Sequence, residues 1–153
     1  MISQTDYQVV DLAVFAAANL MNVLLIGIFL SRPYGLKRAE RVLGLISVCL
    51  ALPLGLAAIL NWWGQREWWT VVLPGLLAVF LVVELLLDYV LKADFRRTRL
   101  LGPYLLLYYA AVMGMVGYSF LVGEVYGFVT LATYFLCLFA TWYSYAKVGH
   151  GQR

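Results

Sequence analysis

The chain has 153 residues, of which 64% are hydrophobic and only 12% are charged, and its formal net charge is +3. Soluble globular proteins carry about a quarter charged residues, so this composition excludes a fully water-facing surface and predicts an all-α protein embedded in lipid. The small net charge gives no sign of nucleic-acid binding, and we expect membrane lipids rather than nucleic acid as partners.

Five apolar stretches are long enough to cross a bilayer, whose core of about 30 Å needs around 20 helical residues. They predict an integral membrane bundle of five transmembrane helices, at residues 9–30, 42–60, 70–91, 100–121 and 126–146. The links between them are too short to fold alone. Residues 1–153 are therefore expected to form a single transmembrane domain, with any function built from the helices and their links.

Basic residues fall almost entirely on one side of these five helices. Arg66, beside Glu67, is the exception, and the other ten are Arg32, Lys37, Arg38, Arg41, Lys92, Arg96, Arg97, Arg99, Lys147 and Arg153. The positive-inside rule then predicts a multi-pass protein of the cell membrane, with its N-terminus outside and its C-terminus in the cytoplasm.

The second stretch and the link after it contain two local signals. Pro53 lies in the middle of 42–60 and should kink that helix, because proline has no N–H and its ring clashes with the preceding turn. The link Asn61–Trp69 contains four tryptophans. Indoles favour the membrane interface, so we interpret them as an anchor in the outer leaflet in preference to a ligand cage.

Glu84 and Asp88 are the acids that need an explanation, because a charged group near the centre of a membrane helix costs about 2.5–3.5 kcal/mol. They lie four residues apart and should share one helix face. The cost indicates that Glu84 faces protein or water instead of lipid. Asp88 is closer to the headgroups, where pairing with a basic residue such as Lys92 or Arg96 is the favoured interpretation.

Other polar residues fall near the depth of Glu84 when the helices are aligned. Asn22, Tyr108 and Thr141 lie at about its depth, and Asn19 lies one turn away. We expect Glu84 to face the bundle and to contact some of them. Three interpretations stay open. The layer holds the helices together around a protonated Glu84, it is a proton- or cation-responsive site, or it forms a polar pocket for an amphipathic ligand that includes Asp88.

The basic links also have two interpretations. Their charges satisfy the positive-inside rule without any further role, which is the favoured reading. They could also bind anionic lipid headgroups or the phosphate of a lipid substrate, and the residues considered for this are Arg38, Arg41, Arg96 and Arg97.

Enzyme chemistry has little support in the residues. The only histidine is His150, in the tail, so no metalloprotease motif or histidine base lies in the membrane. Cys49 and Cys137 are isolated, without a C-x-x-C pair. No catalytic residue, metal ligand or cofactor is assigned, and a non-enzymatic role is favoured. A lipid-modifying enzyme that uses Glu84 or Asp88 is a weaker alternative.

Two functional hypotheses follow. The leading one is a small membrane protein that binds or transports a small or lipid-like ligand in an inner-leaflet pocket around Glu84. The alternative is a non-catalytic subunit of a larger membrane complex, since small residues such as Ser47, Ala51, Gly55 and Ala58 recur at helical spacing and suit packing within the bundle, in a homo-oligomer or with other subunits.

In size and helix number the chain resembles the tryptophan-rich sensory protein (translocator) family, which also has five short-linked helices. The Trp- and Pro-rich signature of that family is absent here, because the tryptophans cluster in one link. The resemblance therefore implies an architecture and no residue roles.

Overall fold

The structure, a computed structural model, describes residues 4–91 and 98–148, with side chains from residue 7 onward. These residues are helical throughout, apart from short links, and contain no strand. The elements are α1 (Gln4–Ser31), α2 (Lys37–Cys49), α3 (Ala51–Trp63), α4 (Trp68–Glu84), the π-helix η1 (Leu85–Val90), α5 (Leu101–Val122) and α6 (Glu124–Val148).

Five helical rods are long and apolar enough to cross a membrane, which confirms the predicted all-α bundle. The rods are Tyr7–Ser31, Lys37–Trp63, Trp68–Val90, Leu101–Val122 and Glu124–Val148. Their bounds agree with the predicted stretches to within a few residues. The largest difference is in the second rod, which begins at Lys37 because the basic first turn of α2 is helical although it is too polar to be recognised by hydropathy.

The second rod is interrupted where Pro53 predicts a kink. Helix α2 ends at Cys49 and α3 begins at Ala51. Proline at position 53 cannot donate to the carbonyl of residue 49 and its ring crowds that carbonyl. The N–H of Leu50, at the junction, bonds to the Ser47 carbonyl at 3.1 Å, one residue tighter than an α-helical bond. The helix is therefore interrupted at Leu50, three residues before Pro53.

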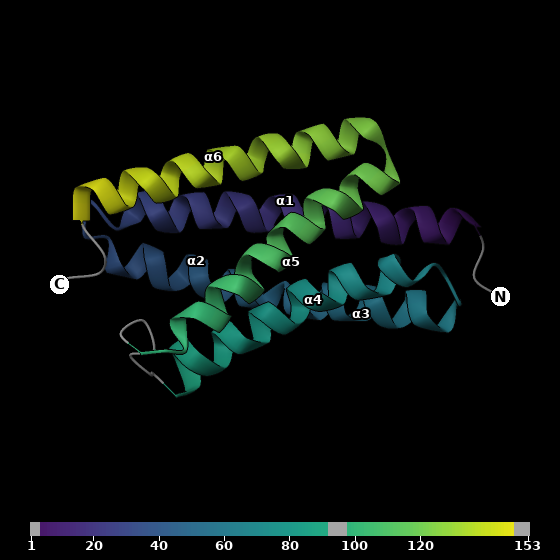
Figure 1. Cartoon of the computed structure of the whole chain (residues 1–153), viewed down its shortest axis with the longest axis horizontal. Helices are drawn as coiled ribbons and strands as arrows, with labels where there is room; N and C mark the ends of the chain where they lie inside the picture. The colour runs from purple at the N-terminus through teal and green to yellow at the C-terminus, as the bar shows by residue number, and fades with distance from the viewer. Residues whose placement is uncertain (1–3, 92–97, 149–153) are drawn as a thin grey trace.

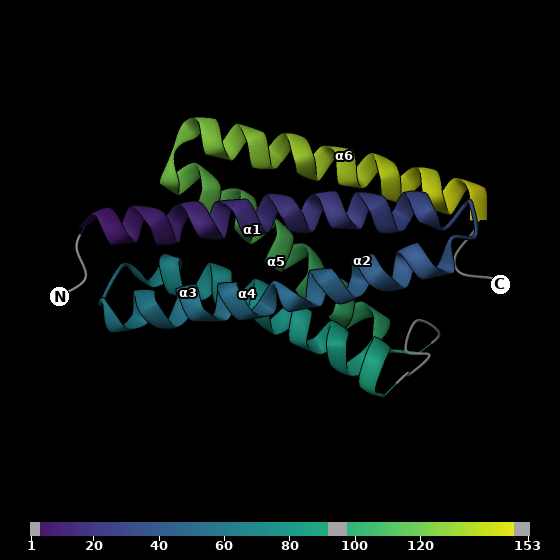
Figure 2. The ribbon, with the colours of Figure 1, turned by 180° about the vertical axis from the view of Figure 1, so that it is seen from behind.

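The rods form one elongated bundle in which α5 is the diagonal element (Figures 1 and 2). Helix α1 packs against α6, α2 and α3, and α3 and α4 form an antiparallel hairpin. Helix α5 packs against both α4 and α6. It crosses from α4 to α6 along its length, so its first turns lie away from the end of α6 (Figure 1).

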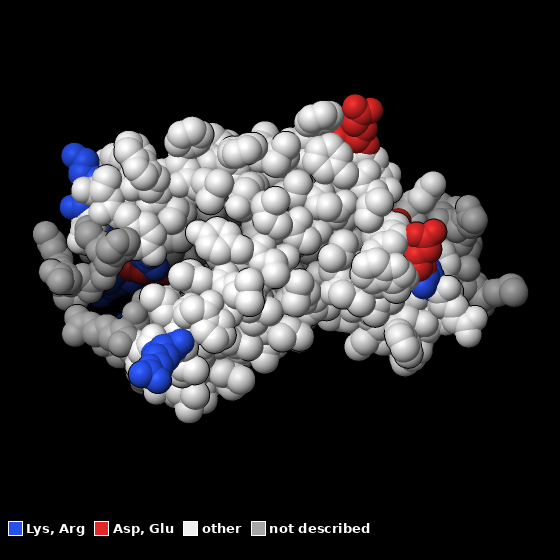
Figure 3. Space-filling view, in the orientation of Figure 1, with Lys and Arg blue, Asp and Glu red and all other residues white. Residues whose placement is uncertain are grey.

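The two ends of the bundle differ in composition. We call the end where α1 and η1 finish and α2 and α5 begin the basic end. The end where α3 finishes and α4 begins is the tryptophan end. In Figure 3 the charged side chains gather at the two ends, and uncharged side chains cover the face between them. This distribution suits a protein whose middle faces hydrocarbon and whose ends face headgroups and water.

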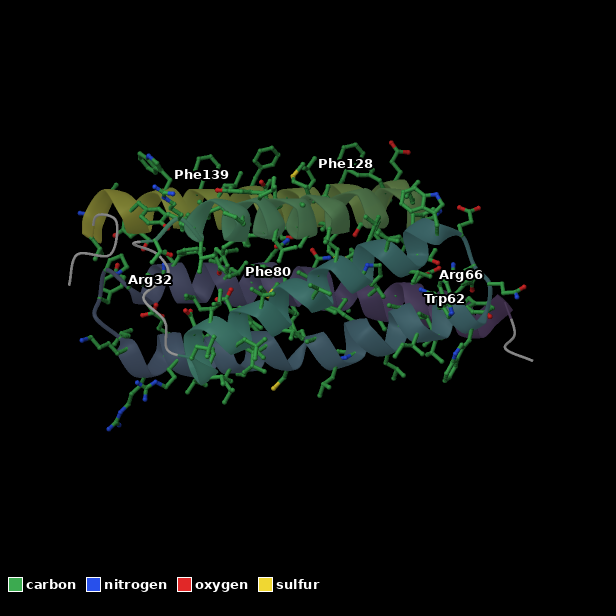
Figure 4. The ribbon with its side chains drawn as sticks, turned by 60° about the horizontal axis from the view of Figure 1, so that its bottom comes forward. Arg32, Trp62, Arg66, Phe80, Phe128 and Phe139 are labelled. Carbon is green, nitrogen blue, oxygen red and sulfur yellow. The ribbon has the colours of Figure 1, made fainter. Side chains whose placement is uncertain are left out.

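Helix packing in the interior uses small side chains and a few large ones. Ala17 and Ala18 on α1 and Ala111 on α5 are buried and allow close approach of the helix backbones. Phe80 and Tyr118 are the largest fully buried side chains. Tyr118 lies near the tryptophan end, whereas Phe80 lies near the middle of the rod Trp68–Val90, one turn before Glu84 (Figure 4).

Candidate functional site

Glu84 is the last residue of α4, and its carboxylate accepts a hydrogen bond of 2.5 Å from the hydroxyl of Tyr104 in the first turn of α5. Phe80, one turn before Glu84, packs its ring 5.6 Å from the ring of Tyr104 and 5.4 Å from the ring of Tyr108. The α4 face formed by Phe80 and Glu84 thus lies against the α5 face formed by Tyr104 and Tyr108. Glu84 is half-buried in this contact.

A π-helix begins directly after Glu84. In η1 the backbone is wider than in an α-helix, and the N–H of Leu91 bonds to the carbonyl of Leu86, five residues earlier, at 2.8 Å. Asp88 lies within this turn and is half-buried. Neither Glu84 nor Asp88 is without an interaction partner. Short π-helical segments are rare in proteins, and many of those that occur lie at functional sites. The sequence pattern does not predict this one.

The basic first turns of α2 lie beside η1. The Tyr89 hydroxyl donates to the Arg41 carbonyl at 3.4 Å, which is a long contact, and it occupies the space beside Gly44. A small hollow of about 230 Å³ at the start of α2 is lined by Lys37, Arg38, Arg41 and Val42. Two of the predicted headgroup-binding residues, Arg38 and Arg41, are therefore neighbours. Arg96 and Arg97, like Lys92, fall outside the described residues.

The link between α1 and α2 is closed by an ion pair at the same end. Arg32 Nε lies 2.8 Å from Glu40 Oε1, and the Arg32 guanidinium carbon lies 4.9 Å from the centre of the Phe29 ring. Figure 4 labels Arg32 at this end. In Figure 3 the molecule is hollowed at the basic end, below α6, and acidic and basic atoms are visible on the floor of the hollow. Helix α5 begins beside α4, and its first turn lies away from the end of α6 (Figure 1).

Asn19 and Asn22 belong to a different site from Glu84. Asn22 Nδ2 donates to Thr133 Oγ1 at 3.0 Å, Thr133 Oγ1 donates to Asn19 Oδ1 at 2.8 Å, and Asn19 Nδ2 donates to Thr130 Oγ1 at 3.0 Å. Thr130 Oγ1 in turn donates to Ser119 Oγ at 2.9 Å. This network, which we call the α1–α6 network, joins α1, α5 and α6 in the middle of the bundle.

Tyr108 and Thr141 lie between these two sites without joining them. Tyr108 packs against Phe80 and its hydroxyl faces the Cys137 thiol. The Thr141 hydroxyl donates to the Cys137 carbonyl in its own helix at 2.8 Å. Glu84 bonds to Tyr104, with Tyr108 on the same face of α5, while Asn22 bonds to Thr133 of α6. Alignment by depth gives the height of each residue but not the direction in which it points.

The tryptophan end contains a charged network that the sequence did not predict. Arg66 forms a two-pronged contact with Asp11, at 2.7 Å from Nη1 to Oδ1 and 2.9 Å from Nη2 to Oδ2. Arg66 Nη1 also donates to Asn61 Oδ1 at 3.0 Å, and the Tyr118 hydroxyl donates to Asp11 Oδ1 at 2.6 Å. We call these four residues the Asp11–Arg66 network. It ties α1, α3 and α5 to the link before α4.

Local structure positions Arg66 in this network. The buried amide of Asn61 donates to the Thr70 carbonyl at 2.8 Å and so closes the hairpin between α3 and α4. The guanidinium lies 5.0 Å from the centre of the Tyr7 ring. Its hydrogen bond to Asp11 raises the pKa of Arg66 above the ordinary arginine value. Arg66 therefore stays protonated at every pH in normal use.

One signal in the sequence could have indicated this network. Arg66 is the only basic residue on its side of the predicted bundle, and Asp11 lies just inside the first apolar stretch on the same side. An acid placed inside an apolar stretch needs a partner, and a solitary cation at the same height is the natural one.

Three further observations concern buried polar groups, metal ligands and known proteins. Every buried side-chain nitrogen and oxygen in the described part of the chain has a hydrogen-bond partner. Among those same residues there is no group of three His, Cys, Asp or Glu side chains that could hold a metal ion. Comparisons with protein-family models, curated proteins and solved structures find no match, so no residue role comes from a relative.

Proposed function

We propose that this chain is a small multi-pass membrane protein that binds or moves a small amphipathic, lipid-like ligand at the basic end, with Glu84 and Tyr104 as the polar contacts. One observation carries the proposal: the Glu84–Tyr104 hydrogen bond joins α4 to α5 at the start of a π-helix and leaves the carboxylate half-buried. The same end of the molecule is hollowed (Figure 3). A half-buried carboxylate at that position can accept from a ligand as well as from Tyr104.

The depth of Glu84 suits a ligand that enters from the bilayer. The third rod ends at Val90, six residues after Glu84. At a rise of about 1.5 Å per residue the carboxylate lies roughly 9 Å inside the end of the rod. A ligand could place its polar group near Glu84 and Tyr104 and its apolar part against the exposed apolar faces of the helices. The basic hollow at Lys37, Arg38 and Arg41 would then attract a negatively charged headgroup.

The proposal includes an orientation. The positive-inside rule would place the basic end in the cytoplasm. The test uses a background without native cysteines, made by C49A and C137A, with single cysteines introduced at Leu36 or at Gln65. A membrane-impermeant maleimide added to intact cells should label the Gln65→Cys protein and spare the Leu36→Cys protein. The reverse pattern would overturn the orientation.

Ligand binding is tested by native mass spectrometry of the detergent-purified protein under conditions that retain lipids. The wild-type protein should carry a defined adduct, and the adduct should be lost in Glu84→Gln and reduced in Tyr104→Phe. Glu124→Gln is the matched control, since Glu124 is an exposed acid at the start of α6, at the tryptophan end. If Glu84→Gln retains every adduct that the wild-type protein carries, the site is overturned.

The second candidate is an accessory subunit of a membrane complex, and a feature of α6 favours it. Exposed aromatic side chains follow one stripe of this helix: Phe128, Phe135, Phe139 and Trp142. Figure 4 labels Phe128 and Phe139 on the side of α6 that faces away from the bundle. Their spacing of seven, four and three residues keeps them on one face. Stoichiometric co-purification with another membrane subunit, lost when Phe135 and Phe139 are changed to leucine, would support this role in place of the first.

A further inference from the structure

The tryptophan end contains a second cavity, separate from the Glu84 site and at the opposite end of the bundle. It has a volume of about 470 Å³ and is lined by Trp62, Gln65, Arg66, Trp68, Val71 and Val72. Figure 4 labels Trp62 and Arg66 at this end. The lining has two parts: polar groups in the link after α3, and valines in the first turns of α4. A cavity with one polar and one apolar part, at the edge of the membrane-spanning rods, suits an amphipathic molecule.

The link is built in a conformation that presents its side chains to this cavity. Gln65 has a φ of 50°, in the left-handed region that residues other than glycine rarely adopt. The turn is held by the Arg66 N–H, which bonds to the Asn61 carbonyl at 3.1 Å. Backbone strain of this kind persists only where surrounding contacts enforce it. Here the enforcing contact is the Asp11–Arg66 network, which fixes the guanidinium beside the cavity.

Arg66 retains unused hydrogen-bond donors in that position. A guanidinium has five N–H groups in a planar fork. Nη1 donates to Asp11 and Asn61, and Nη2 donates once to Asp11. The Nε hydrogen and the second Nη2 hydrogen have no partner among the residues that the structure describes. These two hydrogens point in parallel from one edge of the fork, which is the arrangement that binds two oxygens of a phosphate.

The charge around the cavity selects among phosphate-bearing ligands. Asp11 already balances the charge of Arg66, so the cavity lining carries no net positive charge. Glu67, next in the link, does not line the cavity, and its carboxylate accepts from the Trp69 indole. The indoles of Trp62 and Trp68 are 70% and 71% exposed and can accept a cation on their faces. A purely anionic headgroup would bring a net charge that the Asp11–Arg66 pair leaves uncompensated. A headgroup with both a phosphate and an ammonium group matches the guanidinium donors and the indole faces together.

We propose that this cavity binds one zwitterionic glycerophospholipid. Its phosphate diester accepts from the free edge of Arg66, its ammonium group lies against the indoles of Trp62 and Trp68, and one acyl chain follows Val71 and Val72 toward the membrane interior. The Asp11–Arg66 pair positions the guanidinium for this contact. The four-tryptophan link is therefore a lipid-binding site in addition to an interfacial anchor.

The experiment measures lipid retention by native mass spectrometry of the full-length protein. It is titrated separately with phosphatidylethanolamine, phosphatidylglycerol, glycerophosphoethanolamine and inorganic phosphate. We expect one phosphatidylethanolamine per protomer, retained in preference to phosphatidylglycerol. The Trp62→Leu/Trp68→Leu double variant should bind it roughly tenfold more weakly, because both indole faces are lost. Trp63→Leu should bind as the wild type does, since Trp63 is 73% exposed but does not line the cavity.

A second variant guards against misfolding of the double variant. Val72→Phe fills the apolar part of the cavity from an exposed position on α4 and leaves the Asp11–Arg66 pair intact, so it should also displace the lipid. Retention of phosphatidylglycerol that the double variant weakens as much as it weakens retention of phosphatidylethanolamine would overturn the proposal. Retention of phosphatidylethanolamine in both the double variant and Val72→Phe would also overturn it. Binding of inorganic phosphate or glycerophosphoethanolamine as tight as that of the lipid would also overturn it, because the acyl chain would then contribute nothing.

Discussion

The two ends of the bundle each place an acid on one helix opposite a tyrosine of α5, but the environments of the acids differ. At the tryptophan end Asp11 binds both Tyr118 and the guanidinium of Arg66, and its side chain is 14% exposed. At the basic end Glu84 accepts a hydrogen bond from Tyr104 and is half-buried. The first acid locks three helices together; the second lies where the helices diverge.

The difference shows how a carboxylate side chain can serve packing at one end of a membrane protein and binding at the other. A carboxylate in lipid must be compensated, and a bidentate guanidinium with an additional hydroxyl compensates Asp11 fully. The diagonal course of α5 then decides which end is tight. Tyr118, near the end of α5, is fully buried, whereas Tyr104, near its beginning, is only partly covered.

The sharpest test replaces the carboxylate at the tryptophan end by the amide of the same size, as Asp11→Asn. The amide cannot pair with the charge of Arg66, so we expect a loss of roughly 2–3 kcal/mol in the free energy of unfolding. The measurement is thermal or denaturant unfolding in detergent. Because the pKa of Arg66 is raised, its contribution is complete below the arginine pKa of the unfolded chain and is lost only as pH rises through the still higher folded value. The loss should therefore be the same at neutral and mildly alkaline pH, and a loss confined to one of them would contradict the ion-pair account.

The basic hollow is tested through lipid retention instead of stability. Arg38→Gln and Arg41→Gln together should weaken the binding of phosphatidylglycerol by up to about 1 kcal/mol for each charge removed. Binding should also weaken as ionic strength rises. Unfolding should stay unchanged, because both residues lie in the exposed first turns of α2. Retention that is independent of both charges would mean that these residues set the orientation of the protein and do not bind lipid.

The α1–α6 network is expected to have an intermediate effect. Thr133→Val keeps the shape of the side chain but leaves the buried amide of Asn22 without its acceptor. A loss of about 1 kcal/mol in the free energy of unfolding should follow, as is typical of polar contacts between membrane helices. Thr141→Val is the control. Its hydroxyl bonds within its own helix, so its removal should have almost no effect.

The smallest effect on stability is expected from Glu84→Gln, the counterpart of Asp11→Asn at the basic end. The amide oxygen can still accept from Tyr104, so unfolding should change by less than about 0.5–1 kcal/mol while ligand retention is lost. A loss of stability as large as that of Asp11→Asn, without any change in bound ligand, would assign Glu84 to packing and remove the contrast between the two ends.

Much of the fold could be predicted because lipid imposes strong local rules. Hydropathy and length find the five rods, and Pro53 marks the break between α2 and α3. The candidate site could be predicted from the sequence only in part. The need to explain Glu84 follows from the cost of a charge in lipid. Its partner does not, because Tyr104 is one of eleven tyrosines, and nothing local to it specifies a contact across helices.

By itself the sequence determined that the chain is a five-helix membrane bundle with one strongly basic side, since both properties depend on the composition of short segments. Only the tertiary structure decided which polar groups meet. The pairing of Asp11 with Arg66, the separation of Asn22 from Glu84, the π-helix after Glu84 and the diagonal path of α5 all depend on how the helices rotate and cross. Those angles are set by side-chain packing between segments far apart in the chain, which no single segment encodes.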